Sequence, residues 1–242
     1  MIAVGAALAV ALASLALLLH GARIGYWPRP PAVAPGTVRH RWFARLALRA
    51  LVHFGAVTVL LLAALGRLDA VARFPPELLS VRALAVAWIG QPGWEPLALG
   101  ALGGVVIATV LERRGRRVTL GDLRAVTPVC RAELGWGVLL AITAGVAEEL
   151  FFRLLLPLLI AIVSGSALVG FAGATAAFGY AHRYQGWRGV LGTVIAGVLL
   201  ALVYLVSGRL WAAMLVHAAI DLNGLVLRPV LSGKLAKPSL RG

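Results

Sequence analysis

Three short stretches of this 242-residue sequence place ionisable side chains in or beside apolar runs. In chain order these side chains are Glu148, Glu149, Arg153, His182, His217 and Asp221. An acidic residue at the centre of a bilayer costs about 2.5–3.5 kcal/mol on insertion scales, so such residues usually face a bundle interior or a wet cavity. Carboxylates and imidazoles together suit water activation and oxyanion stabilisation, and they can equally bind a divalent metal. The sequence therefore predicts a polar, functional site inside an apolar protein.

The first stretch, read as a helix, divides its charges between two faces. Glu149 and Arg153 are four residues apart and can form an ion pair on one face. Glu148 is rotated by about 100° from Glu149, so the same arginine serves it less well. We therefore expect Glu149 and Arg153 to neutralise each other while Glu148 points into a cavity as a general base. The alternative is that both glutamates pair with arginines at a membrane boundary.

The two histidine stretches lie on later apolar runs. His182 follows the run 167–181, one turn after Phe178, and by itself it would be read as an interfacial or capping residue. His217 and Asp221 are four residues apart and therefore neighbours on one helix face. A buried histidine satisfied by its own aspartate explains that pair equally well. Two histidines on separate helices of the part that holds the buried acids favour a shared site.

Composition defines the class of protein. The chain is 61% hydrophobic and 13% charged, whereas a soluble domain is nearer half apolar and a quarter charged. We therefore expect an integral membrane protein. The net charge of +14 comes mainly from arginines between apolar runs, which suits anionic lipid headgroups better than nucleic acid. The single cysteine, Cys130, excludes an internal disulfide and a multi-cysteine metal site.

The apolar runs predict an all-α, polytopic transmembrane bundle of about seven to eight membrane helices, because backbone in lipid must satisfy its own hydrogen bonds. The runs are 2–19, 46–66, 95–111, 134–147, 150–163, 167–181, 189–206 and 210–227. The first is expected to be a retained span because no basic region precedes it. The predicted domains are 1–131 (spans and basic loops), 132–230 (catalytic helical core) and 231–242 (basic tail).

Loops 20–45 and 112–131 are rich in arginine and are expected to be cytoplasmic. With eight crossings, however, the basic tail would end on the opposite side, against the same rule. The conflict disappears if one of the two short runs beside Glu148 and Glu149 does not span fully.

The three stretches carry a family resemblance. "EELFFR" (148–153), "FGYAH" (178–182) and "HAAID" (217–221) resemble, in order, the EExxxR, FxxxH and HxxxN/D motifs of the CPBP family. This family comprises CAAX proteases and bacteriocin-processing enzymes and is also called the Abi family of intramembrane peptidases. The resemblance covers about residues 134–227.

The resemblance implies an intramembrane endopeptidase, similar to CAAX prenyl proteases, that acts without a covalent acyl-enzyme. It implies that Glu148 activates water with the help of His182, and that His217 and Asp221 line the same chamber. Glu149, Arg153 and Phe178 would support the motifs. Because the third motif ends in Asp221 rather than asparagine, no amide donates to an oxyanion there. Asp221 would instead orient or charge His217, which would be the donor.

Other interpretations remain open. No cofactor is expected, although zinc held by Glu148, His182 and His217 is a minority interpretation. A proton-coupled transporter also places acids and histidines in membrane helices, and a catalytically inactive scaffold would keep the fold. The expected partners are membrane lipid and a peptide or protein substrate, with no nucleic acid. The expected location is the prokaryotic plasma membrane, as a multi-pass protein.

Overall fold

The computed structural model describes residues 1–20, 39–90, 94–114, 121–231, 233 and 235. The described residues are predominantly helical, and the α-helices are α1 (Ile2–His20), α2 (His40–Ala50), α3 (Val57–Ala64), α4 (Leu79–Ile89), α5 (Glu95–Arg113), α6 (Leu134–Glu149), α7 (Leu156–Ser164), α8 (Ala167–Ala181), α9 (Gly186–Ser207), α10 (Leu210–Leu222) and α11 (Arg228–Leu231). Three π-helical segments continue the rods between them: η1 (Leu51–Ala56), η5 (Leu150–Leu155) and η7 (Asn223–Leu227). Short 3-10 turns are η2 (Leu68–Val71), η3 (Pro76–Leu78), η4 (Arg131–Glu133) and η6 (Arg183–Gln185).

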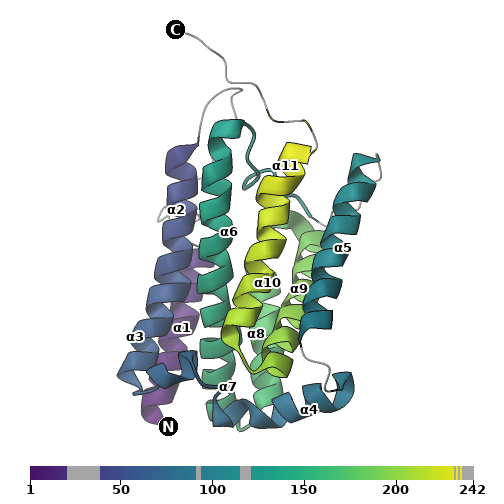
Figure 1. Ribbon diagram of the computed structural model, residues 1–242. Coiled ribbons are helices and arrows are strands. Elements are labelled where there is room, and N and C mark those ends of the chain that lie inside the picture. Colours follow the sequence, from purple (N-terminus) through teal and green to yellow (C-terminus); the bar gives the residue numbers. More distant parts are fainter. Residues whose placement is uncertain (21–38, 91–93, 115–120, 232, 234, 236–242) are drawn as a thin grey trace.

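The helices form an upright bundle, and α4 lies across its lower end (Figure 1). The two apolar runs 134–147 and 150–163, predicted as separate spans, are one continuous rod of α6, η5 and α7. No glycine or proline separates the two runs, so nothing between them ends the helix. Figure 1 shows the start of α1 at the lower end and α11 at the upper end. Merging the two runs removes the conflict over the side on which the last described helix, α11, ends.

Four helical segments in the described part of the chain are long and apolar enough to cross a membrane. They are Ile2–His20, His40–Ala64, Arg183–Ser207 and Leu210–Leu231. The predicted all-helical fold is therefore confirmed for the described residues, whereas the predicted count of seven to eight spans is not confirmed. The expected arginine-rich loop 20–45 lies largely outside the described residues, as does most of the predicted tail 231–242.

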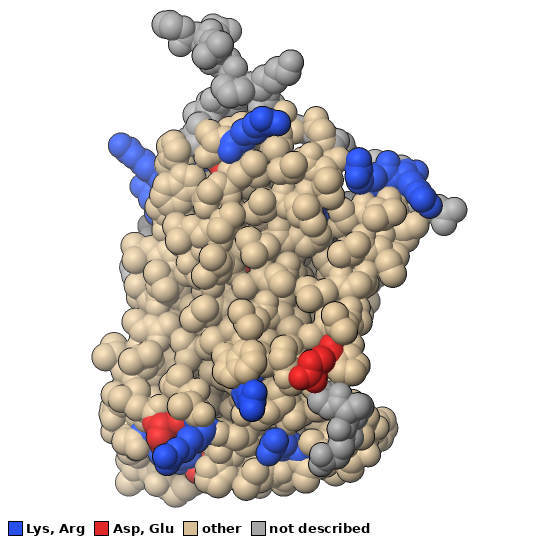
Figure 2. Space-filling view, in the orientation of Figure 1, with Lys and Arg blue, Asp and Glu red and all other residues tan. Residues whose placement is uncertain are grey.

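Charge is distributed as a membrane-embedded bundle requires. On the face in Figure 2, the coloured side chains gather towards the two ends and a broad band without charge lies between them. The upper end collects the start of α2, the end of α5, the connection to α6, and the turn between α8 and α9 (Figure 1). These segments carry Arg39, Arg41, Arg45, Arg113, Arg114, Arg124, Arg131, Arg183 and Arg188. By the positive-inside rule, we predict that the upper end faces the cytoplasm.

The core below the polar site is aromatic. Phe54 of η1 lies 5.0 Å, between ring centroids, from Phe152 of η5, which in turn lies 5.2 Å from Phe178 of α8. All three rings are buried. Such tilted and edge-on pairs are favoured by the ring quadrupoles, beyond the area that they bury. The stack fixes the positions of three helical rods relative to one another along the bundle. It thereby helps to position the neighbouring residues of the polar site.

Two helices of the site approach each other closely at a glycine. A Cβ on Gly145 of α6 would lie 2.8 Å from the backbone nitrogen of Ala218 and 2.9 Å from its Cβ. Only a residue without a side chain allows this approach of α6 and α10, as in other membrane helix pairs with small residues at the contact. Glu148 lies three residues after Gly145 on α6, and His217 directly precedes Ala218 on α10.

The connection 121–133 is fastened to α2 by a buried ion pair. Glu133 is fully buried, and its two carboxylate oxygens accept hydrogen bonds from the Nε (2.9 Å) and Nη2 (2.7 Å) atoms of Arg39. The backbone N–H groups of Arg39 and Val129 donate to the same carboxylate. Burial opposes ionisation of Glu133, but these hydrogen bonds outweigh it and hold the pKa of its carboxyl below the ordinary value. The connection is thereby held over the upper end of the bundle.

Candidate active site

Glu148 and His182 face each other from different helices. Glu148 is the penultimate residue of α6, and His182 is the C-cap of α8. Their closest atoms, Glu148 Oε2 and His182 Nε2, are 3.9 Å apart. Glu148 Oε2 is buried and accepts no hydrogen bond from the residues that the structure describes. The arrangement leaves a carboxylate oxygen and an imidazole nitrogen directed at one small space.

The orientation of His182 is set by its own helix. Its Nδ1 lies 2.9 Å from the carbonyl oxygen of Phe178, one turn earlier. A carbonyl oxygen can only accept, so Nδ1 carries the proton in this contact. In the neutral ring, Nε2 is then an acceptor and faces Glu148. The FxxxH spacing thus selects the tautomer as well as the direction of the ring.

Glu149 is the centre of a second, fully buried group. Its Oε2 is 3.1 Å from Arg153 Nε, as the four-residue spacing predicts. Its Oε1 is 2.7 Å from His217 Nδ1 on α10, a contact that the sequence did not predict. Glu149 therefore connects the first motif to the third. Burial of this carboxylate is tolerable because Oε1 accepts a hydrogen bond from the His217 ring and the cation of Arg153 lies beside Oε2, which accepts no hydrogen bond from the described residues.

Asp221 is farther from His217 than Glu149 is. Its Oδ2 lies 3.7 Å from His217 Nε2, which is an ion-pair distance but too long for a hydrogen bond. The direct hydrogen-bond partner of His217 is Glu149, although Asp221 was expected to orient this ring. Spacing in the sequence identifies neighbours within one helix. The carboxylate nearer to His217, that of Glu149, comes from another helix. Asp221 remains beside the second ring nitrogen.

Phe178 lies at the meeting point of the three motifs. Its ring centroid is 4.8 Å from that of His182 and 5.8 Å from that of His217. The guanidinium carbon of Arg153 lies over the same ring, 4.2 Å from its centroid. A cation over an aromatic face is attracted by the ring quadrupole, most strongly where water is excluded. Phe178 therefore supports both histidines and the charge of Arg153.

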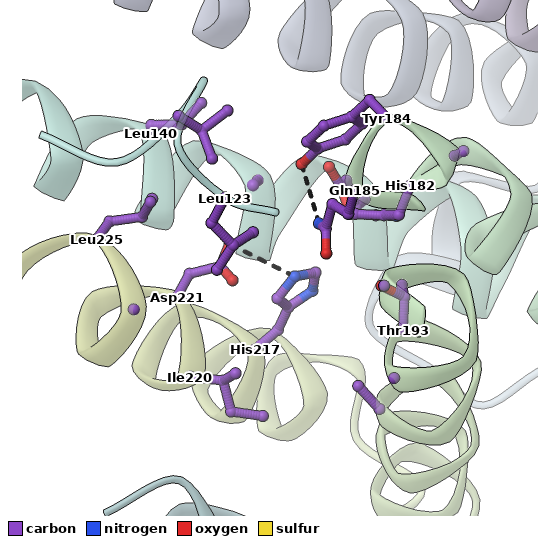
Figure 3. A pocket seen from close by; sticks show the side chains of 18 of the residues that line it. Leu123, Leu140, His182, Tyr184, Gln185, Thr193, His217, Ile220, Asp221 and Leu225 are labelled. Carbon is purple, nitrogen blue, oxygen red and sulfur yellow. Dashed lines mark hydrogen bonds and ion pairs between the residues drawn. The ribbon is translucent and has the colours of Figure 1, made fainter. Parts of the chain in front are cut away.

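These side chains border a cavity of about 790 Å³. Glu148, Phe178, His182, His217 and Asp221 line it together, which is the convergence that the sequence required. Figure 3 shows His217 and Asp221 on one helix, with His182 and Tyr184 on the opposite side. Glu149 and Arg153 lie behind this lining, consistent with their buried positions.

Sequence reasoning missed several polar residues of the cavity wall. Tyr184 and Gln185 directly follow the second motif, and Asn223 follows the third. Trp42 and Thr109 reach the cavity from the first 131 residues, which were expected to supply only spans and loops. The polar residues "RYQ" after His182 were the one feature of the sequence that indicated further cavity residues, because they separate two apolar runs.

The arrangement of carboxylates and rings bears on metal binding. Among the residues that the structure describes, no three His, Cys, Asp or Glu side chains are grouped so that they could hold a metal ion. The Nδ1 of His217 in particular is engaged by Glu149, and a carboxylate, that of Asp221, also lies near its Nε2.

Comparison with known proteins agrees with the three motifs. Residues 131–223 match a protein-family model described as "Type II CAAX prenyl endopeptidase Rce1-like". This segment contains all three motifs and most of the helices that carry them. Searches of curated proteins and of solved structures gave no match. In residues 131–223 this membrane protein therefore carries a domain of the CAAX protease family.

Proposed function

We propose that the protein is an intramembrane endopeptidase that hydrolyses a peptide bond with a water molecule activated by Glu148 and His182. The observation that carries the proposal is the unsatisfied, buried Oε2 of Glu148, 3.9 Å from His182 Nε2 at the wall of a cavity. Because the cavity lies towards the arginine-rich end, we propose that the substrate enters from the cytoplasmic side. We also propose that the membrane is a prokaryotic plasma membrane.

The separation of the two groups fits one bridging water. A water hydrogen-bonded to both at about 2.8 Å would place its partners 3.9 Å apart if the angle at the water were about 90°. Both partners are acceptors when Glu148 is ionised and His182 is neutral. The water would therefore donate both protons to the protein, and its lone pairs would face the cavity. Such a water is oriented for attack on a carbonyl carbon.

The remaining steps use groups already in place. Glu148 takes a proton from the attacking water, and the pair Glu148–His182 passes a proton to the leaving amine. His217 stabilises the tetrahedral oxyanion through Nε2, while Asp221 balances the charge of the ring. No serine or cysteine lies in the three motifs, so we propose direct attack by water without an acyl-enzyme.

We also propose that this chemistry needs no metal ion. The proposal follows from His217, whose Nδ1 is engaged by Glu149 and whose Nε2 faces Asp221. Purified protein treated with EDTA or 1,10-phenanthroline should retain its wild-type rate. Loss of activity that zinc restores would overturn this part of the proposal and favour a metal site.

The decisive experiment compares two glutamate variants in proteoliposomes. The first probe is a fluorescence-quenched, farnesylated CAAX peptide, because the matching family is described by prenylated substrates. Glu148→Gln should lower the rate of cleavage by at least about 100-fold, because the general base is lost. Glu95→Gln, at an exposed position of α5, is the matched control and should cleave at the wild-type rate. Wild-type cleavage by Glu148→Gln would overturn the assignment.

The natural substrate is sought by proteomics of membranes carrying wild-type protein or Glu148→Gln. Peptides whose ends differ between the two membranes identify the cleaved protein. The unprenylated form of the probe, measured in parallel, separates recognition of the peptide from recognition of the lipid. Transport of protons with no cleavage of any peptide would instead favour a carrier.

A further inference from the structure

The cavity contains an amide that can replace the one missing from the third motif. Position 221 is an aspartate, and an ionised carboxylate cannot donate a hydrogen bond to an oxyanion. Two side-chain amides line the cavity, Gln185 and Asn223. Asn223 donates from Nδ2 to the Thr109 hydroxyl at 3.0 Å, and this contact joins α5 to η7. Gln185 is the amide that stands next to the histidine of the second motif.

The backbone of Gln185 is held at both of its polar groups. Its N–H donates to the carbonyl oxygen of His182 at 3.0 Å, and its own carbonyl accepts from the N–H of Asp122 at 3.0 Å. The first bond closes the tight turn η6, which leads from His182 to Gln185. The second ties the same turn to the connection 121–133. Gln185 is therefore positioned relative to His182 more firmly than a residue on an unsupported loop.

Two glycines leave the space that the Gln185 side chain occupies. A Cβ on Gly189 would lie 2.3 Å from Gln185 Cβ. A Cβ on Gly121 would lie 3.0 Å from Gln185 Oε1 and 2.7 Å from the Cα of Gly189. Gly121 also has a φ of +97°, which side chains rarely adopt. Any larger residue at these positions would displace Gln185 from the cavity wall.

Tyr184 completes the polar group. Gln185 Nε2 donates to the Tyr184 hydroxyl at 3.2 Å, which uses one of the two amide protons. The centroid of the Tyr184 ring is 5.9 Å from that of the His182 ring. Figure 3 shows Tyr184 and Gln185 joined, on the side of the cavity opposite Asp221. The pair thus faces the proposed reaction space from the wall that His217 does not occupy.

We infer that Gln185, oriented by Tyr184, holds the carbonyl oxygen of the scissile peptide bond through its amide N–H. This inference rests on the proposed peptidase function and adds a donor to it. His217 and Gln185 would then bind the oxygen from two sides as its charge develops. The hydrogen bond to Tyr184 uses one amide N–H and leaves the second free to bind the substrate oxygen.

The test uses Gln185→Glu and Gln185→Met, which keep the size of the side chain and remove the amide donor. With the farnesylated probe in proteoliposomes, both variants should lower kcat by about 100-fold, the usual effect of deleting one oxyanion donor. KM and the melting temperature should stay at wild-type values. Tyr184→Phe should lower kcat by a smaller factor. Glu95→Gln, which lies outside the cavity lining, is again the control, with wild-type kcat expected.

The outcomes separate this inference from the function on which it rests. If Glu148→Gln is inactive while both Gln185 variants keep the wild-type kcat, only the inference is overturned. A fall in melting temperature that accounts for the lost activity would mean a structural role and would overturn it too. If the wild-type protein cleaves no peptide, the proposed function fails and the inference fails with it.

Discussion

At the scale of single residues, the two adjacent glutamates have different surroundings. Glu148 lines the cavity, whereas Glu149 lies behind the lining, where it forms an ion pair with Arg153 and a hydrogen bond with His217. A rotation of about 100° along one helix is enough to separate these environments. We infer that one glutamate carries the chemistry while its neighbour holds two motifs together.

Replacing Glu149 with glutamine should destabilise the protein strongly. The change leaves the buried guanidinium of Arg153 without its countercharge, which typically costs about 3–5 kcal/mol. The measurement is the free energy of unfolding in mixed micelles titrated with SDS. Glu77→Gln is the matched control, because the Arg67–Glu77 pair is partly exposed and worth at most about 1 kcal/mol. Equal losses in the two variants would contradict the central role of Glu149.

A second substitution distinguishes lost charge from lost packing. Combining Glu149→Gln with Arg153→Met removes both charges, and should recover part of the lost stability because no buried cation is left unpaired. No recovery would mean that the hydrogen bond from His217 dominates the stability.

At the scale of the elements, the position of the site depends on the approach of α6 to α10. Gly145 makes this approach, and it lies one turn before Glu149. The π-helical segments η1, η5 and η7 continue three of the rods around the same region. Such segments shift the phase of a helix and are frequent at functional sites. Here η5 begins directly after Glu149.

Adding one methyl group at Gly145 should push these helices apart. The Cβ of Gly145→Ala would meet backbone and side-chain atoms of Ala218, so the helices must separate at a cost of about 1–3 kcal/mol. Cleavage should also fall, because Glu148 and His217 are carried by the separated helices. Gly135→Ala on the same helix meets no atom within 4 Å and should be neutral or slightly stabilising. A neutral Gly145→Ala would show that the contact does not position the site.

At the scale of the whole molecule, the arrangement of arginines orients the bundle. The upper end carries more arginine than the lower end, and the cavity is lined by residues from the connection 121–133 and the turn after α8 (Figure 1). The cavity therefore lies towards the arginine-rich end. By the positive-inside rule, a substrate would reach it from the cytoplasmic half of the membrane.

Cysteine labelling tests this orientation. In a Cys130→Ala background, Asp69→Cys should react with a membrane-impermeant maleimide in intact cells. Arg124→Cys should react only after permeabilisation. Both positions are exposed, and they lie in segments at opposite ends of the bundle. Labelling of both residues from the same side would contradict the arrangement, and the reverse pattern would place the arginine-rich end outside the cell.

Much of the site was predictable from local sequence. The i,i+4 spacing predicted the Glu149–Arg153 pair, and the position of His182 after an apolar run predicted a residue at a helix end. Separate spans for 134–147 and 150–163 were wrong, because hydropathy falls at Glu148 and Glu149 although the helix continues. The domain boundary near residue 131 stays a prediction, and Trp42 and Thr109 from the first part line the cavity.

The sequence by itself determined the class of protein, the helical secondary structure and the residues able to do chemistry. These properties depend on composition and on spacing within single helices, which local physics decides. Only the tertiary structure decided that Glu149 meets His217, 68 residues away, and that Gln185 reaches the cavity between two glycines. Such contacts depend on how closely two backbones can approach. That distance is set by packing across helices, which no pattern within one helix records.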